Sequence, residues 1–85
     1  MRLDKFLQVS RLVKRRTWAR EMCLAGRVSV NGRVARPATP VRPGDLIRLD
    51  TEWRVLEVEV RELRERASAV EARQMYTVVS SQGRD

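Results

Sequence analysis

The chain has 85 residues, of which 42% are hydrophobic, and its 18 Lys and Arg against 11 Asp and Glu give a net charge of +7. This length fits one small domain and leaves little room for a deep catalytic pocket. With one cysteine and no histidine, a single chain cannot form a disulfide framework, a Cys/His zinc site or a histidine acid–base centre.

The first predicted element is a short helix that opens the chain. Leu3, Phe6 and Leu7 stand at i, i+3 and i+4, which is the spacing of an apolar stripe on one helix face. Arg2 and Lys5 share another face of the same helix. Residues 10–16 follow with four cations and are predicted to form a basic connector.

A second helix is predicted from Arg16 or Thr17 to Ala25, with Thr17 as its N-cap. Gly26 follows and suits the left-handed C′ position at which many helices end. The apolar stripe of this helix comprises Ala19, Met22 and Cys23. Because Cys23 lies on that stripe, we expect it to behave as a small apolar residue.

A change to period two marks the start of a sheet. Val28 and Val30 alternate with Ser29, and Asn31-Gly32 is the strongest short hairpin signal, with residues 33–35 as the returning strand. A turn at residues 43–45 then leads into a strand over residues 46–49. The longest predicted strand alternates apolar and charged residues and includes Leu56, Val58 and Val60.

The C-terminal part is predicted to add a helix and a strand. Ser68 and Glu71 match a capping box, and residues 75–80 have the composition of a strand. The whole order predicts an α+β fold with two N-terminal helices packed on a small, mostly antiparallel sheet. Residues 51–85 are expected to extend the same single domain as residues 1–50, because no linker divides the chain.

The positive charge is confined to one half of the sequence. Residues 1–48 have a net charge of +9 and residues 49–85 a net charge of −2. Such asymmetry favours a polyanionic partner; base composition of the genome could explain the many arginines, but not their uneven distribution. The cations surround short core-forming stripes and not one long amphipathic helix, which favours nucleic acid over a membrane surface. No segment reads as a membrane span or signal peptide, so we expect a cytoplasmic protein.

Four motifs, in this order, resemble the RNA-binding domain named after ribosomal small-subunit protein S-four, also called the alpha-L motif. They are Arg2-Leu-Asp-Lys-Phe-Leu7, Arg15-Arg-Thr-Trp-Ala-Arg20, Gly26-Arg-Val-Ser-Val-Asn-Gly32 and Val41 to Gly44-Asp45. The resemblance implies an alpha-L RNA-binding core over residues 1–50. The Lys-Arg-Arg-Thr and terminal Met-Tyr-Thr segments are similar to the RqcP (YabO-like) family of bacterial ribosome-associated quality-control factors, over nearly the whole chain.

This resemblance implies a noncatalytic, ribosome-associated factor without a cofactor. Members of the family bind the large ribosomal subunit while it carries a stalled peptidyl-tRNA after subunit splitting. They hold that tRNA in place while an RqcH-like factor directs alanine tailing of the nascent chain. The expected partners are therefore large-subunit ribosomal RNA, peptidyl-tRNA and an RqcH-like tailing factor. We expect the chain itself to be a monomer in solution.

The residues predicted to bind RNA lie on the two helices, the connector and the turn after the second helix. The family's RNA-contacting positions match Arg2, Lys5, Arg15, Arg16, Arg20 and Arg27. Helical periodicity indicates much the same set, because Arg16 and Arg20 share a face and Arg15 stands at a helix N-terminus, which favours phosphate. The full predicted set is Arg2, Asp4, Lys5, Arg11, Lys14, Arg15, Arg16, Arg20 and Arg27. A merely solvated surface would mix both signs of charge more evenly than this helix pair does.

Asp4 has three interpretations within so basic a segment. It could be a helix-N-terminal acid stabilised by the helix dipole. It could pair with Arg16 or Lys5 and fix the direction of that cation toward RNA. It could also contact a base amino group or a ribose hydroxyl directly. The second and third gain weight from the resemblance, because the family motif places an acid at this position.

The two tryptophans could stack on bases or pack against the core. We expect Trp53 to pack against the core. Both alternatives stay open for Trp18, because it lies off the apolar stripe of its helix.

Two other functions compete with the main interpretation. One is a heat-shock-type relative that binds large subunits with stalled peptidyl-tRNA, although such relatives typically carry a longer basic C-terminal tail. The other is an RNA-binding module detached from an RNA-modifying enzyme. Glu57 and Glu59 fall on one strand face without a partner base, so we expect no enzymatic activity and a solvated face directed away from RNA.

Overall fold

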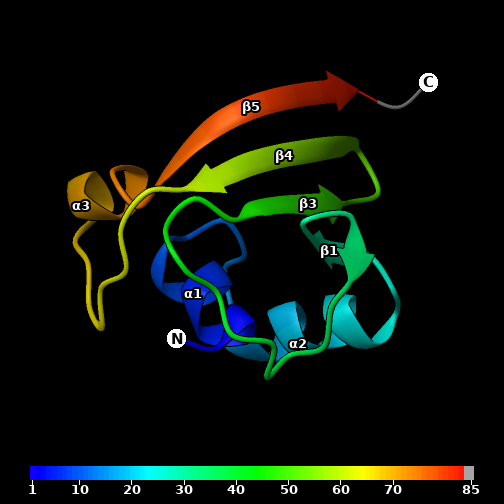
Figure 1. The fold of residues 1–85 in the computed structure, drawn as a ribbon, viewed down its shortest axis with the longest axis horizontal. Coiled ribbons are helices and arrows are strands. Elements are labelled where there is room, and N and C mark those ends of the chain that lie inside the picture. Colours follow the sequence, from blue (N-terminus) through cyan, green and yellow to red (C-terminus); the bar gives the residue numbers. More distant parts are fainter. Residues whose placement is uncertain (84–85) are drawn as a thin grey trace.

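Two short helices lie on one side of an antiparallel five-stranded sheet (Figure 1). The computed structural model describes residues 1–83. The elements in chain order are α1 (Leu3–Val9), α2 (Arg16–Leu24), β1 (Val28–Val30), β2 (Arg33–Val34), β3 (Leu46–Asp50), β4 (Arg54–Val60), α3 (Ala69–Arg73) and β5 (Tyr76–Gly83). The strand order is β2-β1-β3-β4-β5, and every neighbouring pair is antiparallel. The α+β prediction is therefore confirmed.

The core lies between the two helices and the inner face of the sheet. Leu3, Phe6 and Leu7 of α1 are fully buried, as their spacing predicts. Ala19 and Cys23 of α2 are buried against them, and burial raises the pKa of the Cys23 thiol to about 11, so the thiol stays protonated. The sheet contributes Val28, Ile47, Leu49, Val58 and Val60. Full burial of such a side chain contributes roughly 1.5–3 kcal/mol, which holds both helices against the sheet.

α2 begins at Arg16, one of the two predicted starts, but its N-cap residue differs from the prediction. Gly26 has φ +76°, the left-handed conformation predicted for the residue after the helix. The N-cap is Arg15, in extended conformation and without a side-chain cap bond, so the prediction of Thr17 as the N-cap is wrong. The chain turns helical at Arg16, which places Thr17 inside the first turn.

The hairpin between β1 and β2 is the predicted one. Asn31 and Gly32 both have positive φ, at 52° and 82°, as a type I′ turn requires. The Asn31 side chain also donates to Asp45 at 3.1 Å and accepts from the Leu46 backbone N–H at 2.9 Å. The hairpin is thereby tied to the turn that leads into β3.

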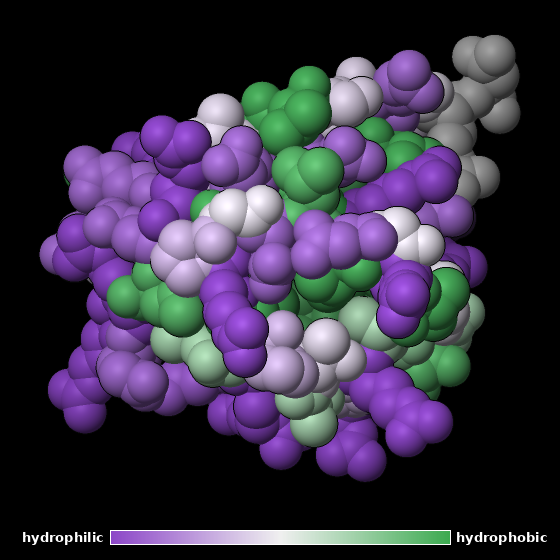
Figure 2. All heavy atoms as spheres, viewed as in Figure 1, coloured by the Kyte–Doolittle hydropathy of each residue, from purple (hydrophilic) through white to green (hydrophobic). Residues whose placement is uncertain are grey.

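The C-terminal extension continues the sheet beyond β3. Ser68 and Glu71 form the predicted capping box at the start of α3. The pairing of β4 with β5 shifts at a bulge between Glu57 and Val58. Figure 2 shows apolar groups along β5, where the Val78 side chain is 51% exposed. The division of the domain at residue 50 stays a prediction. None of the helices within residues 1–83 is long and apolar enough to cross a membrane.

The prediction of core packing for Trp53 is wrong. Its side chain is 77% exposed, and it lies in the turn between β3 and β4. Thr51 and Arg54 close that turn through a backbone bond of 2.9 Å and a side-chain bond of 2.8 Å. The turn therefore leaves this large apolar side chain open to solvent.

Candidate RNA-binding surface

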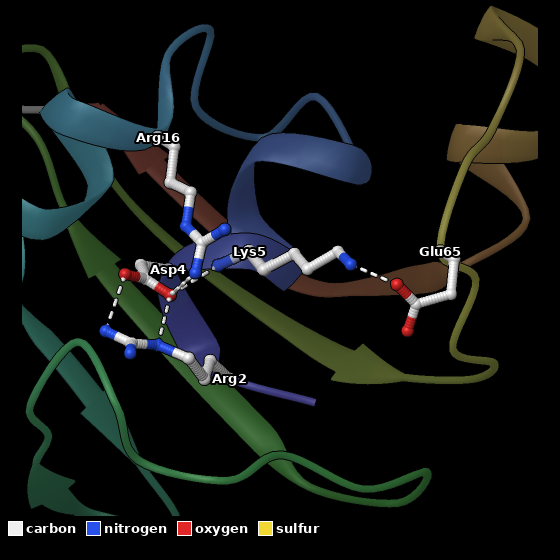
Figure 3. A network of polar contacts seen from close by, with 5 residues as sticks. All are labelled: Arg2, Asp4, Lys5, Arg16 and Glu65. Atoms are coloured by element: carbon white, nitrogen blue, oxygen red, sulfur yellow. Dashed lines mark hydrogen bonds and ion pairs between the residues drawn. The ribbon is translucent and has the colours of Figure 1, made fainter.

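Asp4 is the centre of a charged cluster between α1 and α2 (Figure 3). Its carboxylate accepts two hydrogen bonds from Arg2, from Nε at 3.2 Å and from Nη2 at 3.1 Å. Arg16 Nη2, from the start of α2, donates to the same carboxylate at 3.3 Å. The backbone N–H of Lys5 donates to it at 2.8 Å. We call Arg2, Asp4 and Arg16 the arginine cluster.

Packing explains why these side chains meet. The buried residues of α1 and α2 hold the two helices together, so the first residue of α2 lies beside the first turn of α1. Arg2 is fixed independently, because it forms an isolated β-bridge with Pro40. Arg2 and Arg16 therefore approach the buried carboxylate of Asp4 from two different segments.

The electrostatics of the arginine cluster leave it with a net positive charge. Burial by itself would raise the pKa of Asp4, but the hydrogen bonds from Arg2, Arg16 and the Lys5 N–H outweigh burial and lower that pKa. Asp4 is thus a carboxylate at neutral pH, with a side chain only 4% exposed, between arginines whose side chains are 49% and 46% exposed. These bonds fit the positioning interpretation of Asp4 and add Arg2 as a partner that the sequence did not suggest.

Lys5 points away from the arginine cluster (Figure 3). Its ammonium group forms an ion pair with Glu65, which lies in the loop between β4 and α3 and has a side chain 77% exposed. The hydrogen bond and charge of Lys5 lower the pKa of Glu65. No pattern in the sequence indicates this contact, because the two residues are 60 positions apart.

The other predicted residues occupy several places. Arg20 lies beside the arginine cluster. One shallow hollow of about 350 Å³ is lined by Arg2, Asp4, Arg16, Thr17 and Arg20. Arg11 and Lys14 line a different hollow at the C-terminal end of α1. Arg27 lies apart from both, beside Asp50, Thr51 and Glu52. The structure thus brings together Arg2, Asp4, Arg16 and Arg20 and separates the rest.

Arg15 contacts an aromatic ring and forms no ion pair within residues 1–83. Its guanidinium lies 5.4 Å from the centroid of the Trp18 ring, which is within cation–π distance. Trp18 is 47% exposed, so about half of its side chain is open to solvent.

Comparison with known proteins assigns this surface to a family domain. The S4 domain matches residues 1–47, which include the arginine cluster. The RQC P-site tRNA stabilizing factor of Bacillus subtilis (strain 168) is 44% identical over 82 residues, which are 96% of this chain and 95% of that protein. The factor of the same name from Listeria monocytogenes is 41% identical over 85 residues, 100% of this chain and 92% of that protein.

A second group of similar proteins has a different name. A heat shock protein 15 homolog of Aeromonas salmonicida is 37% identical over 81 residues, which cover 58% of that protein. The solved structure of heat shock protein 15 from Vibrio cholerae, described as trimeric, superposes with a TM-score of 0.85 at 32% identity, covering 94% of this chain and 82% of that one.

Proposed function

This chain belongs to the family of RQC P-site tRNA stabilizing factors and contains an S4 domain, and from that premise we propose that it is a noncatalytic, ribosome-associated RNA-binding factor. It binds ribosomal RNA of the large subunit together with peptidyl-tRNA. The arginine cluster is the observation that carries this proposal. It places two arginines with half-exposed side chains, both bonded to one buried carboxylate, on the matched S4 segment.

A fixed guanidinium suits a phosphate better than a free one. Two parallel N–H groups can contact two phosphate oxygens, and the geometry adds specificity to charge. An arginine that is already held in place loses less side-chain entropy on binding than an unrestrained one. Asp4 therefore acts as a positioning residue in this proposal, while Arg2, Arg16 and Arg20 touch RNA.

We further propose that the chain stabilises the tRNA in the P site of a split large subunit while an RqcH-like factor adds alanine to the nascent chain. The name of the relatives, RQC P-site tRNA stabilizing factor, supports the P-site part of this proposal. The heat-shock-type function is the second candidate, favoured by the TM-score of 0.85. Coverage favours the first candidate, because 95% of the Bacillus subtilis protein matches but only 58% of the Aeromonas salmonicida one.

The test is co-sedimentation with purified ribosomal particles. We expect the chain to bind large subunits that carry peptidyl-tRNA more tightly than vacant large subunits, and small subunits weakly. If about six phosphates are neutralised, the log–log slope of affinity against salt should be near −5. Equal binding to all particles, or affinity independent of salt, would contradict the proposal.

Two further measurements address the partners. Mass spectrometry of stalled nascent chains should show alanine tails in cells that express the chain, and shorter or no tails in cells without it. Unchanged tails would contradict the role beside an RqcH-like factor and leave RNA binding intact. Light scattering of the free protein should give the mass of a monomer, 9.9 kDa, whereas a mass near three times that value would match the trimer described for heat shock protein 15.

A further inference from the structure

A second basic hollow lies at the opposite end of α1 from the arginine cluster. It has a volume of about 440 Å³ and is lined on one side by Gln8 and the connector, and on the other by residues 65–67. Three cations line it, namely Arg11, Lys14 and Arg66. We call it the connector hollow. Its two sides come from segments more than 50 positions apart, and Arg11 Nη2 links them by donating to the Ala67 carbonyl at 3.5 Å.

The cations of the connector hollow have no carboxylate partners within the described part of the chain. Nearby arginines of the extension are engaged: Arg61 pairs with Glu59 at 3.4 Å, and Arg64 pairs with Glu62 at 3.2 Å and Glu71 at 2.9 Å. The side chains of Lys14 and Arg66 make no ion pair or hydrogen bond within residues 1–83.

The acid that lines the connector hollow does not neutralise it. The carboxylate of Glu65 forms an ion pair with Lys5 of α1, and Lys5 does not itself line the connector hollow. Three cations therefore converge on one concave surface with a single carboxylate that is already paired. Exposed cations gathered without counter-charges in this way repel one another, and an anion bound between them would relieve that repulsion.

We propose that the connector hollow binds a backbone phosphate of RNA, and that Arg66 thereby brings the C-terminal extension into contact with RNA. This inference rests on the proposed function. The seven residues of α1 are about 10 Å long at 1.5 Å per residue, so one RNA strand that runs along α1 reaches both the arginine cluster and the connector hollow. Arg66 lies outside residues 1–47, so the S4 match does not account for it.

The experiment measures large-subunit binding of Arg66 variants over a series of salt concentrations. Arg66→Ala should lower affinity about 3- to 10-fold and reduce the magnitude of the salt slope by about 1. Arg66→Lys should retain most of the affinity, because no carboxylate within residues 1–83 orients Arg66 and its contact with phosphate therefore depends chiefly on charge. Arg73→Ala is the matched control: Arg73 is also exposed, lies on α3 away from the connector hollow and has no ion pair within residues 1–83. It should change affinity less than twofold.

Particles with and without tRNA identify the source of the phosphate. A loss with Arg66→Ala on vacant large subunits assigns a ribosomal RNA phosphate, and a loss only on subunits that carry P-site tRNA assigns a tRNA phosphate; either supports the inference. Equal binding by Arg66→Ala and Arg73→Ala, with intact wild-type binding, overturns the inference and leaves the proposed function standing. Failure of the wild type to bind any large subunit overturns both. A loss of affinity that follows a fall in melting temperature would make Arg66 a folding residue and also overturn the inference.

Discussion

The arginines on the helical side of the molecule and those of the C-terminal extension differ in how their charge is balanced. In the extension, Arg64 has two carboxylates within 3.2 Å, both on side chains about half exposed. On the helical side, Arg2 and Arg16 share the single buried carboxylate of Asp4. The first arrangement neutralises charge locally, and the second orients two cations while leaving a surplus. By this measure of charge balance, Arg66, which has no carboxylate partner within residues 1–83, resembles the helical side.

The sharpest test of this comparison is Arg16→Ala. Loss of an oriented phosphate contact should cost about 1–3 kcal/mol of RNA affinity, or roughly 5- to 150-fold. Arg16→Lys should recover only part of it, because an ammonium cannot make the bidentate contact. Co-sedimentation with large subunits measures the effect.

Melting of the same Arg16 variant separates binding from folding. Arg2 and the Lys5 N–H continue to satisfy Asp4 when Arg16 is removed. Stability should therefore fall by no more than about 1 kcal/mol, as for a partly exposed ion pair. Unchanged sedimentation of well-folded Arg16→Ala would remove Arg16 from the RNA-binding surface.

The second prediction concerns acid. The pKa of Asp4 is lowered below its ordinary 3.8 in the folded protein, so the bonds to Arg2 and Arg16 stabilise the fold above that pH. This contribution should be lost as pH falls through the folded-state pKa. Hydrogen bonds to a charged group contribute about 1.5–3 kcal/mol, so wild type should melt at least about 5 °C above Asp4→Asn at pH 7. The difference should narrow below pH 3.8; a constant difference down to pH 2 would contradict the assignment.

A smaller effect is expected from Glu65→Gln. The substitution releases Lys5 from its ion pair and removes the negative charge beside the connector hollow. RNA affinity should rise about 2- to 5-fold, and the salt slope should steepen by up to about 1, because one more cation becomes available to phosphate. Filter binding at several salt concentrations measures both. Decreased affinity would show that Glu65 supports the RNA-binding surface and does not compete with it.

The smallest effect is predicted on the sheet face turned away from the helices. Glu57 of β4 stands opposite Arg48 of the neighbouring strand β3, and Glu59 forms an ion pair with Arg61. Replacing both glutamates with Lys should change large-subunit binding less than about twofold, because added charge there is roughly a Debye length or more from the helical side. A severe loss with the fold preserved would place RNA on the opposite face from the one proposed.

Local patterns in the sequence account for the elements of this fold. The i, i+3, i+4 spacing of Leu3, Phe6 and Leu7 determined which side of α1 is buried, and Asn31-Gly32 determined the type of hairpin. The capping box at Ser68 determined where α3 begins. Each of these signals acts over five residues or fewer, where chain geometry fixes what can meet. Trp53 shows the limit, because its large apolar side chain predicted burial, while its place in the turn between β3 and β4 left it exposed.

The sequence by itself determined that the first 48 residues are strongly basic and that RNA-binding residues should be sought there. Only the tertiary structure decided how those cations are distributed. Packing of α2 against α1 placed Arg16 on Asp4, 12 positions away, and the return of the chain after β4 placed Glu65 on Lys5 and Arg66 beside Lys14. The physical reason is that a side chain's charge is read from its residue type, whereas its partners depend on long-range packing that no local pattern encodes.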